Sequence, residues 1–290
     1  MIEVLSSLGC RVLKDEPLSM HCSFKIGGPA DFFIEIPNEL ALSEFLRIIS
    51  DGRFCILGGG TNILFSDEGY RGTIVRLTGC FKEISVSGDE ILCGGGALLS
   101  DVLKTACENG LTGLECTAGI LGTVGGAVYG NVGRGDKWIS AVIKSVEVYK
   151  NLKKELINRE KAIFGYRKSG FENSIILKVV FSLKKDMKND SLKEISKNMQ
   201  KRLETQPLNI PNAGSIFKNP DGFSVGKLIE EAGLKGIYAG KAQISELHGN
   251  FIVNTGGAFA EDVLALINLI KEKVKEKFGI SLETEIKIIK

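Results

Sequence analysis

The sequence predicts an α+β fold in two parts, and three patterns lead to this prediction. Short apolar runs that end in glycine are frequent in the first half of the chain, as in strands followed by tight turns. Residues 150–205 shift toward lysine, which we interpret as a solvated helix face. After residue 213, apolar residues recur at helical spacing over longer stretches than in the first half. We expect an N-terminal segment at 1–21, a first domain at 22–187 and a second domain at 188–290.

Strands and helices alternate in the first half. Apolar and β-branched runs predict strands, and amphipathic spacing predicts helices. The strands are expected at 54–57, 73–77, 91–93 and 142–149, and the helices at about 38–50 and 98–109. Asn109-Gly110 is a common signal for the end of a helix, so the second helix should end there.

The second half predicts longer helices and one terminal strand. Ser191 and Glu194 have the spacing of a capping box, so a helix should begin there and end at Gln206-Pro207. Further helices are expected at about 225–232 and 260–278, the latter closed by Gly279. Residues 282–288 alternate between apolar and polar, as a strand with one buried face does.

Composition excludes several classes of protein. The chain has 290 residues, of which 43% are hydrophobic and 25% charged, so it is globular rather than disordered. A net charge of +2 argues against a nucleic-acid partner. The seven cysteines lack C-x-x-C spacing, which argues against zinc sites and disulfide frameworks and favours the cytoplasm. Residues 116–133 are uncharged, but six glycines argue against a membrane helix. We expect no metal site.

Three glycine-rich loops could bring backbone N–H groups close to phosphate oxygens. They lie at 57–62, 93–96 and 119–126. None fits the Rossmann or the P-loop fingerprint. The alternative is that these glycines only form turns and bulges. A serine hydrolase is disfavoured because no G-x-S-x-G motif occurs and the chain has only two histidines, His21 and His248.

Three polar elements stand out against this background. They are Tyr166-Arg167-Lys168-Ser169-Gly170-Phe171, the small-residue segment 212–220, and Glu285 in the terminal strand. Taken singly, each has a structural explanation: Ser215 could cap a helix, Arg167 could form an ion pair, and Glu285 could be an exposed strand position.

Taken together, eight ordered motifs make the chain resemble the UDP-N-acetylenolpyruvoylglucosamine reductase (MurB) family. The most specific motif is Gly-Ser-Ile-Phe-Lys-Asn-Pro at 214–220, and the likeness extends from about residue 20 to 290. Only 47 residues separate Arg167 from Ser215, so the chain resembles the shorter, second type of the family. The motifs lie at 23–30, 57–62, 113–115 with 119–126, 166–171, 206–208, 214–220, 228–236 and 282–286.

The resemblance implies a fold, a cofactor and a reaction. The first domain would be a two-lobed FAD-binding domain of the PCMH/vanillyl-alcohol-oxidase type, and the second a smaller α+β substrate-binding domain. NADPH would reduce FAD, and the enolpyruvyl ether of UDP-N-acetylglucosamine would then be reduced in the same cleft to UDP-N-acetylmuramate for peptidoglycan synthesis. We expect a cytoplasmic monomer that inserts into no membrane. The FAD contacts implied are Gly58, Gly59, Gly60, Thr61, Asn62, Gly119, Ile120, Leu121, Gly122, Thr123 and Gly126.

The resemblance also implies residue roles. The family's catalytic Arg, Ser and Glu fall on Arg167, Ser215 and Glu285. Hydride addition to an enolpyruvyl group places negative charge beside the carboxylate, so a cation must stabilise that charge and an acid must quench it. Arg167 would bind the carboxylate, Ser215 would donate the proton, and Glu285 would help to hold the enol form. The implied substrate contacts are Tyr166, Lys218, Asn219 and Lys287.

The sequence departs from the family pattern at two site positions. Leu121 replaces the usual proline of Gly-Ile-Pro-Gly, which frees a backbone torsion angle and returns an N–H group. Lys287 replaces a common arginine, so substrate binding should be weaker without loss of catalysis. Two alternatives stay open: an FAD-dependent oxidase or dehydrogenase of the same superfamily with another substrate, and a non-catalytic UDP-sugar-binding protein.

Overall fold

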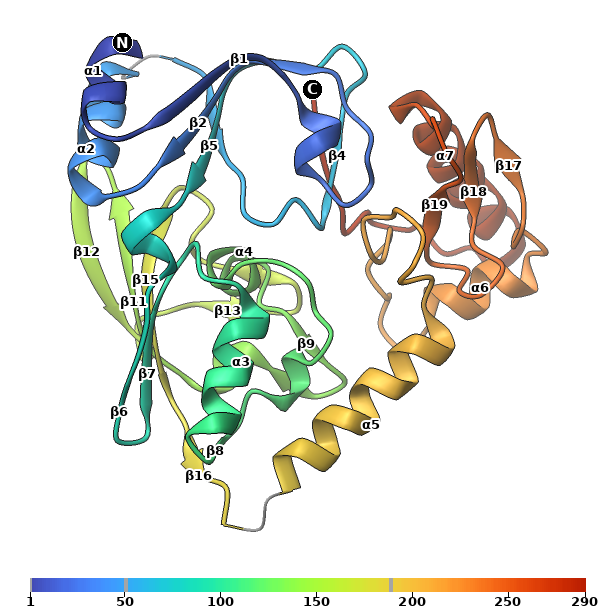
Figure 1. Ribbon diagram of the computed structural model, residues 1–290. Coiled ribbons are helices and arrows are strands. Elements are labelled where there is room, and N and C mark those ends of the chain that lie inside the picture. The colour runs from blue at the N-terminus through green and yellow to red at the C-terminus, as the bar shows by residue number, and fades with distance from the viewer. Residues whose placement is uncertain (1, 50–51, 188–189) are drawn as a thin grey trace. The chain divides into compact units, whose positions relative to one another are not determined.

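The computed structural model describes residues 2–49, 52–187 and 190–290 (Figure 1). The chain divides into two compact units, each made of several segments of the sequence. The first contains Met1–Lys14, Phe32–Gly59 and Gly72–Gln200, and the second contains Asp15–Asp31, Gly60–Arg71 and Lys201–Lys290. Residues 22–31 and 60–71, which the sequence assigned to the first domain, therefore belong to the second compact unit.

The first unit is built on a five-stranded antiparallel sheet of order β12-β11-β15-β7-β6. Its central strand, β15, is almost continuously apolar because both of its faces are covered. Ile176, Val179 and Phe181 join one hydrophobic cluster, whereas Ile175 and Leu177 join another. The strands are β6 (Ile84–Ser87), β7 (Glu90–Gly94), β11 (Ile143–Lys150), β12 (Lys153–Asn158) and β15 (Ile175–Ser182).

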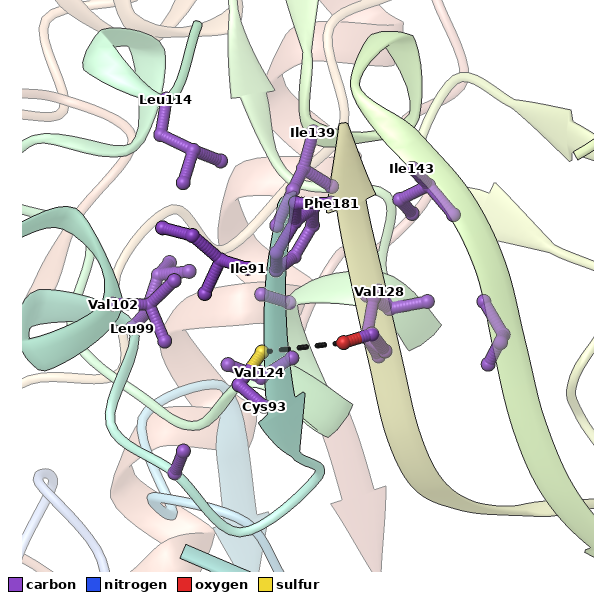
Figure 2. Packing of buried hydrophobic residues seen from close by; sticks show 14 of the residues in the cluster. Ile91, Cys93, Leu99, Val102, Leu114, Val124, Val128, Ile139, Ile143 and Phe181 are labelled. Atoms are coloured by element: carbon purple, nitrogen blue, oxygen red, sulfur yellow. Dashed lines mark hydrogen bonds between the residues drawn. The ribbon is translucent and has the colours of Figure 1, made fainter. Parts of the chain in front are cut away.

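Two helices pack on one face of this sheet and form the larger core (Figure 2). They are α3 (Leu99–Glu108) and α4 (Val124–Tyr129), which contact β7 and β15. Cys93 lies among these apolar side chains, and its thiol donates a hydrogen bond to the Val179 carbonyl at 3.6 Å. Burial raises the pKa of the Cys93 thiol to about 12, so it is a core residue rather than a reactive one.

The opposite core lies against α2 (Glu39–Ile48) and a four-stranded sheet of order β1-β2-β5-β3. Asn38 caps α2 by accepting the Ala41 N–H at 2.9 Å. The sheet strands are β1 (Arg11–Pro17), β2 (Pro29–Ile36), β5 (Tyr70–Leu77) and β3 (Phe54–Ile56). Smaller elements are α1 (Ile2–Ser7), η2 (Gly79–Lys82), β8 (Leu111–Thr112), η3 (Glu115–Thr117), β9 (Gly133–Arg134), β10 (Lys137–Trp138), η4 (Ile139–Ala141), β13 (Phe164–Gly165), β14 (Lys168–Ser169) and β16 (Lys184–Lys185).

The second unit packs α7 (Ala260–Phe278) against α6 (Val225–Glu231) and a small β17-β18-β19 sheet. The Asp67 carboxylate accepts the Ala260 and Glu261 N–H groups at 2.8 and 3.2 Å and so caps α7 from a distant part of the sequence. Gly279 ends α7 in the left-handed conformation, as expected. The remaining elements are η1 (Leu18–His21), β4 (Ile63–Phe65), β17 (Tyr238–Ala239), β18 (Ala242–Ile244), β19 (Ile252–Asn254) and β20 (Lys287–Ile289).

Two local predictions were wrong. The helix α5 (Asp190–Thr205) is not capped by Ser191. Asp186 accepts the N–H groups of Asp190 and Ser191, each at 3.1 Å, because it precedes the helix and faces its first turn. The terminal strand is also shorter than 282–288: β20 covers only Lys287–Ile289, in parallel with β4, and Thr284 forms an isolated antiparallel bridge with Phe217. Residues 283–285 are hydrogen-bonded to residues 216–218 instead of to β4, so no single ladder covers 282–288.

The described residues contain no helix that is long and apolar enough to cross a membrane. Within the same ranges, no three His, Cys, Asp or Glu side chains gather as a metal site would require.

We expect Phe181→Ala to lower the free energy of unfolding by ~3–5 kcal/mol, because it leaves a cavity beneath α3 and α4. Urea unfolding followed by circular dichroism measures the change. Leu156→Ala is the matched control, since Leu156 is 64% exposed on β12 and should change stability by no more than about 0.5 kcal/mol. Equal losses in both variants would contradict this description of the core.

Candidate active site

Two of the predicted glycine loops lie against each other in the first unit. A β-carbon on Gly59 would lie 2.7 Å from the Gly122 α-carbon, and one on Gly58 would lie 2.6 Å from the Thr123 hydroxyl. Such distances leave no room for a side chain. The two loops can therefore approach this closely only because Gly58 and Gly59 carry no side chain. The sequence predicted both loops as FAD contacts but not that they touch.

The paired loops offer backbone donors to a ligand. Within the described part of the chain, the N–H groups of Gly58, Gly59, Gly122 and Thr123 donate to no other residue. Clustered N–H groups of this kind bind anionic oxygens. Leu121, in the second loop, is 66% exposed. The geometry fits a ligand that carries phosphate groups.

The third glycine loop has a structural explanation. A β-carbon on Gly94 would lie 2.0 Å from the Phe81 carbonyl oxygen, and one on Gly95 would lie 2.1 Å from the Ile176 carbonyl oxygen. Here the glycines allow segments of backbone to pack closely. The interpretation as turns and bulges therefore holds for 93–96, whereas 58–59 and 122–123 present donors.

The second unit brings Ser215 and Glu285 together through the backbone. The Glu285 N–H donates to the Ile216 carbonyl at 2.8 Å, and the Lys218 N–H donates to the Glu283 carbonyl at 2.9 Å. The segments that carry Ser215 and Glu285 therefore run side by side, and Phe217 pairs with Thr284 between them. Both side chains are half-buried. Two predicted catalytic residues that are far apart in the sequence are thus neighbours.

Asn62 from the predicted FAD loop joins the same backbone network. Its side-chain amide donates to the Glu285 carbonyl at 3.3 Å, and its own carbonyl accepts the Lys287 N–H at 3.0 Å. The Lys287 side chain is exposed. One flavin-loop residue, the candidate acid partner and one predicted substrate contact therefore lie on adjacent strands.

Ser23 stabilises the Ser215 loop, a role that the sequence analysis missed. The Ser23 hydroxyl donates to the Asn212 carbonyl at 2.6 Å, and its N–H donates to the Gly60 carbonyl at 3.0 Å. Asn212 in turn accepts the Gly214 N–H at 2.8 Å, which shapes the turn before Ser215. The signal was present in the 23–30 motif, but nothing in the sequence indicated its distant partner.

Arg167 lies at the tip of a tight hairpin in the first unit. Strands β13 and β14 pair Gly165 with Lys168, so Tyr166 and Arg167 alone form the turn. Arg167 adopts φ +54°, a left-handed conformation that costs a non-glycine residue about 1–2 kcal/mol. Such strain persists only where the surroundings enforce it, and it is concentrated at functional sites.

Two polar side chains hold the hairpin of β13 and β14 in place. The Ser169 hydroxyl donates to the Tyr129 carbonyl at 2.7 Å, at the end of α4. The Asn131 side chain donates to the Gly165 carbonyl at 2.9 Å and accepts the Ser140 N–H at 3.3 Å. Helix α4, which follows the glycine loop, and the turn after it therefore also fix the arginine turn.

Two of the predicted substrate contacts, Lys218 and Asn219, interact with other residues of the chain. Lys218 pairs with Glu283 at the edge of the Ser215 segment. The Asn219 side-chain oxygen accepts the Val225 N–H at 3.0 Å and so caps α6. Its predicted role in substrate binding is additional to that cap and stays a prediction.

His248 has a packing role. Its ring contacts Phe251, and its Nδ1 accepts the Asn250 N–H at 3.2 Å. Burial lowers the pKa of His248, which keeps the ring neutral.

Comparison with known proteins identifies the family. Residues 206–289 match the model of the UDP-N-acetylenolpyruvoylglucosamine reductase C-terminal domain, and residues 30–151 match an FAD binding domain. A UDP-N-acetylenolpyruvoylglucosamine reductase of Pseudothermotoga lettingae is 45% identical over 96% of this chain and 98% of its own length. The chain belongs to the UDP-N-acetylenolpyruvoylglucosamine reductase family.

Other members of this reductase family are similar to this chain over nearly its whole length. The reductase of Carboxydothermus hydrogenoformans is 42% identical over 99% of this chain and 97% of its own length. The crystal structure of the reductase from Thermus caldophilus superimposes with a TM-score of 0.85 at 34% identity, and covers 97% of this chain and 99% of that chain. The α+β fold with an FAD-binding domain, predicted from the motifs, is confirmed.

We expect Ser23→Ala to lower the free energy of unfolding of the second unit by about 1 kcal/mol, because one partly buried hydrogen bond to the 212–215 turn is lost. Thermal unfolding measures the change. Ser19→Ala is the control, since no hydrogen bond of the Ser19 hydroxyl occurs among the described residues. An unchanged midpoint in Ser23→Ala would show that the turn does not depend on this bond.

Proposed function

We infer that this chain reduces the enolpyruvyl ether of UDP-N-acetylglucosamine to UDP-N-acetylmuramate, with FAD as cofactor and NADPH as reductant, in peptidoglycan precursor synthesis. The observation that carries the assignment of residues is the backbone bond from Glu285 to Ile216, at 2.8 Å. It places Ser215 beside Glu285, a pair that an FAD-dependent oxidase acting on another substrate would not need.

The paired glycine loops are suited to hold FAD. Backbone donors at Gly58, Gly59, Gly122 and Thr123 would contact its pyrophosphate, and the exposed Leu121 would pack against its apolar part. The remaining contacts proposed from the sequence are Gly60, Thr61, Asn62, Gly119, Ile120 and Gly126. Bound FAD supplies the chemistry of accepting hydride from NADPH and delivering it to the alkene.

Arg167 would bind the substrate carboxylate. Addition of hydride to the terminal carbon of the enolpyruvyl group leaves an electron pair on the carbon next to the carboxylate. A planar guanidinium can hold both carboxylate oxygens at once, so it stabilises the charge as it spreads onto them. The strained backbone at Arg167 supports this role, because it directs the side chain from a fixed turn.

Ser215 would donate the proton that completes the reaction. A hydroxyl is a weak acid, so it transfers a proton only to a strongly basic carbon, and the carbon next to the developing aci-carboxylate is one. Glu285 on the adjacent strand would hold the enol form of the intermediate. Tyr166, Lys218, Asn219 and Lys287 would contact the rest of the UDP-sugar.

The cysteine content bears on the compartment in which the protein acts. We propose that the protein acts as a monomer in the cytoplasm, where its seven cysteines stay reduced. The pKa values of Cys93 and Cys116 are raised by burial to about 12 and about 11, so neither is poised to form a thiolate at neutral pH.

We expect Ser215→Ala to reduce turnover by about 10²–10⁴-fold, the usual contribution of a positioned acid, while FAD reduction by NADPH stays within twofold. Stopped-flow absorbance separates the two half-reactions. Ser224→Ala is the matched control, because Ser224 is exposed in the same unit and its hydroxyl caps no helix N–H. Turnover near the wild-type rate in Ser215→Ala would exclude Ser215 as the acid.

We expect Arg167→Lys to slow reoxidation of reduced FAD by the UDP-sugar by about 10²-fold, because an ammonium cannot hold a carboxylate bidentately. The FAD content of the purified protein should not change. The ratio of flavin to protein absorbance and the single-turnover rate measure the two effects. Equal losses of FAD and of rate would point to a structural role for Arg167.

A further inference from the structure

The only tryptophan of the chain lies against the arginine to which we assign carboxylate binding. The Arg167 guanidinium carbon is 5.4 Å from the centre of the Trp138 ring and 5.5 Å from the centre of the Tyr166 ring. The two rings meet edge to face, with centres 5.6 Å apart and planes at 80°. All three residues belong to the first unit. The arginine therefore lies over two aromatic rings that also contact each other.

The Trp138 ring is held in place by its own hairpin. Strands β9 and β10 pair Gly133 with Trp138, and a β-carbon on Gly133 would lie 2.9 Å from ring atom Cε3. The missing side chain at Gly133 thus makes room for the indole. Outside the hairpin, the Arg134 guanidinium donates to the Asn198 side chain at 2.9 Å, and Lys137 pairs with Glu194 at 2.7 Å, both on α5. The hairpin that carries Trp138 is therefore fixed at both strands.

Arg167 needs such support for its proposed task. Its side chain has several rotatable bonds, and the loss of this freedom opposes ordered binding. Aromatic faces attract a guanidinium by their negative quadrupole, and they do so without using its N–H donors. Atoms Nε and Nη1 of Arg167 are buried, so solvent weakens this attraction little. Stacking can orient the guanidinium while it leaves the donors to a carboxylate.

We propose that Trp138 is a positioning residue for Arg167. Its ring fixes the plane of the Arg167 guanidinium before the substrate binds. The N–H donors are then already oriented toward the carboxylate of the enolpyruvyl group, and less rotamer entropy is lost on binding. The proposal rests on the proposed function of Arg167. The sequence analysis does not single out Trp138, because Trp138 and Arg167 are 29 positions apart in the sequence and meet only in the folded chain.

The test compares Trp138→Leu with Trp138→Phe in the FAD-loaded protein. Leucine removes the aromatic face, so reoxidation of reduced FAD by the UDP-sugar should slow on the order of tenfold, whereas phenylalanine should restore most of the rate. Reduction of FAD by NADPH and the FAD content should stay within twofold of wild type. Tyr238→Leu is the matched control, since Tyr238 is 58% exposed on β17 in the other unit. A rate in Trp138→Leu equal to wild type, or a loss of FAD that accounts for the slower rate, would overturn the proposal.

A spectroscopic measurement separates this proposal from the function on which it rests. Because Trp138 is the sole tryptophan, indole emission reports its surroundings alone. Arg167→Ala should change the intensity or the maximum of that emission in the holoenzyme, and unchanged emission would overturn the contact. If Arg167→Lys turns over normally, the proposed role of Arg167 fails and the positioning role with it. If Arg167→Lys is impaired but Trp138→Leu is not, only the positioning role fails.

Discussion

Three short stretches of backbone determine what the second unit can present to a substrate. Residues 216–218 are hydrogen-bonded to 283–285, and the strand that continues from there pairs in parallel with β4, next to Asn62. Because these contacts join main-chain atoms, the neighbourhood of Ser215, Glu285 and Asn62 does not depend on the side chains that it brings together. Ser23 and Asn212 reinforce it at one end, and the Asn250 side chain, which bonds both backbone groups of Phe217, reinforces it in the middle.

The first unit combines exposed backbone N–H donors with a packed apolar core. Gly59 and Gly122 bring two loops into contact, and the N–H groups that are left without partners in the described chain point to an anionic ligand. Directly behind these loops, α4 and β15 supply a close-packed apolar core. The glycine loops alone would suit a reductase or an oxidase, whereas the Ser215 and Glu285 pair distinguishes between them.

Much of this arrangement could be predicted from the sequence, and the misses have physical causes. Helices α3, α5, α6 and α7 lie close to their predicted ranges because apolar periodicity reflects burial. The cap of α5 was misassigned because the helix already includes Asp190 and Ser191, whose N–H groups are accepted by Asp186 outside the expected box. The strand at 282–288 was predicted too long because the segment changes its hydrogen-bonded neighbour, from residues 216–218 to β4, and alternation of burial does not reveal such a change. Trp138 and Ser23 could not be found, because their partners Arg167 and Asn212 are close only in the folded chain.

The absorption spectrum of the purified protein, recorded during anaerobic addition of NADPH and then of the enolpyruvyl UDP-sugar, tests the central claim most directly. The assignment predicts a yellow protein that bleaches with NADPH and regains its colour when the UDP-sugar is added in the absence of oxygen. A reduced protein that stays bleached with the UDP-sugar and recovers only when oxygen is admitted would contradict it. A colourless protein that cannot be reconstituted with FAD would also contradict it, and would return the paired glycine loops to a purely structural role.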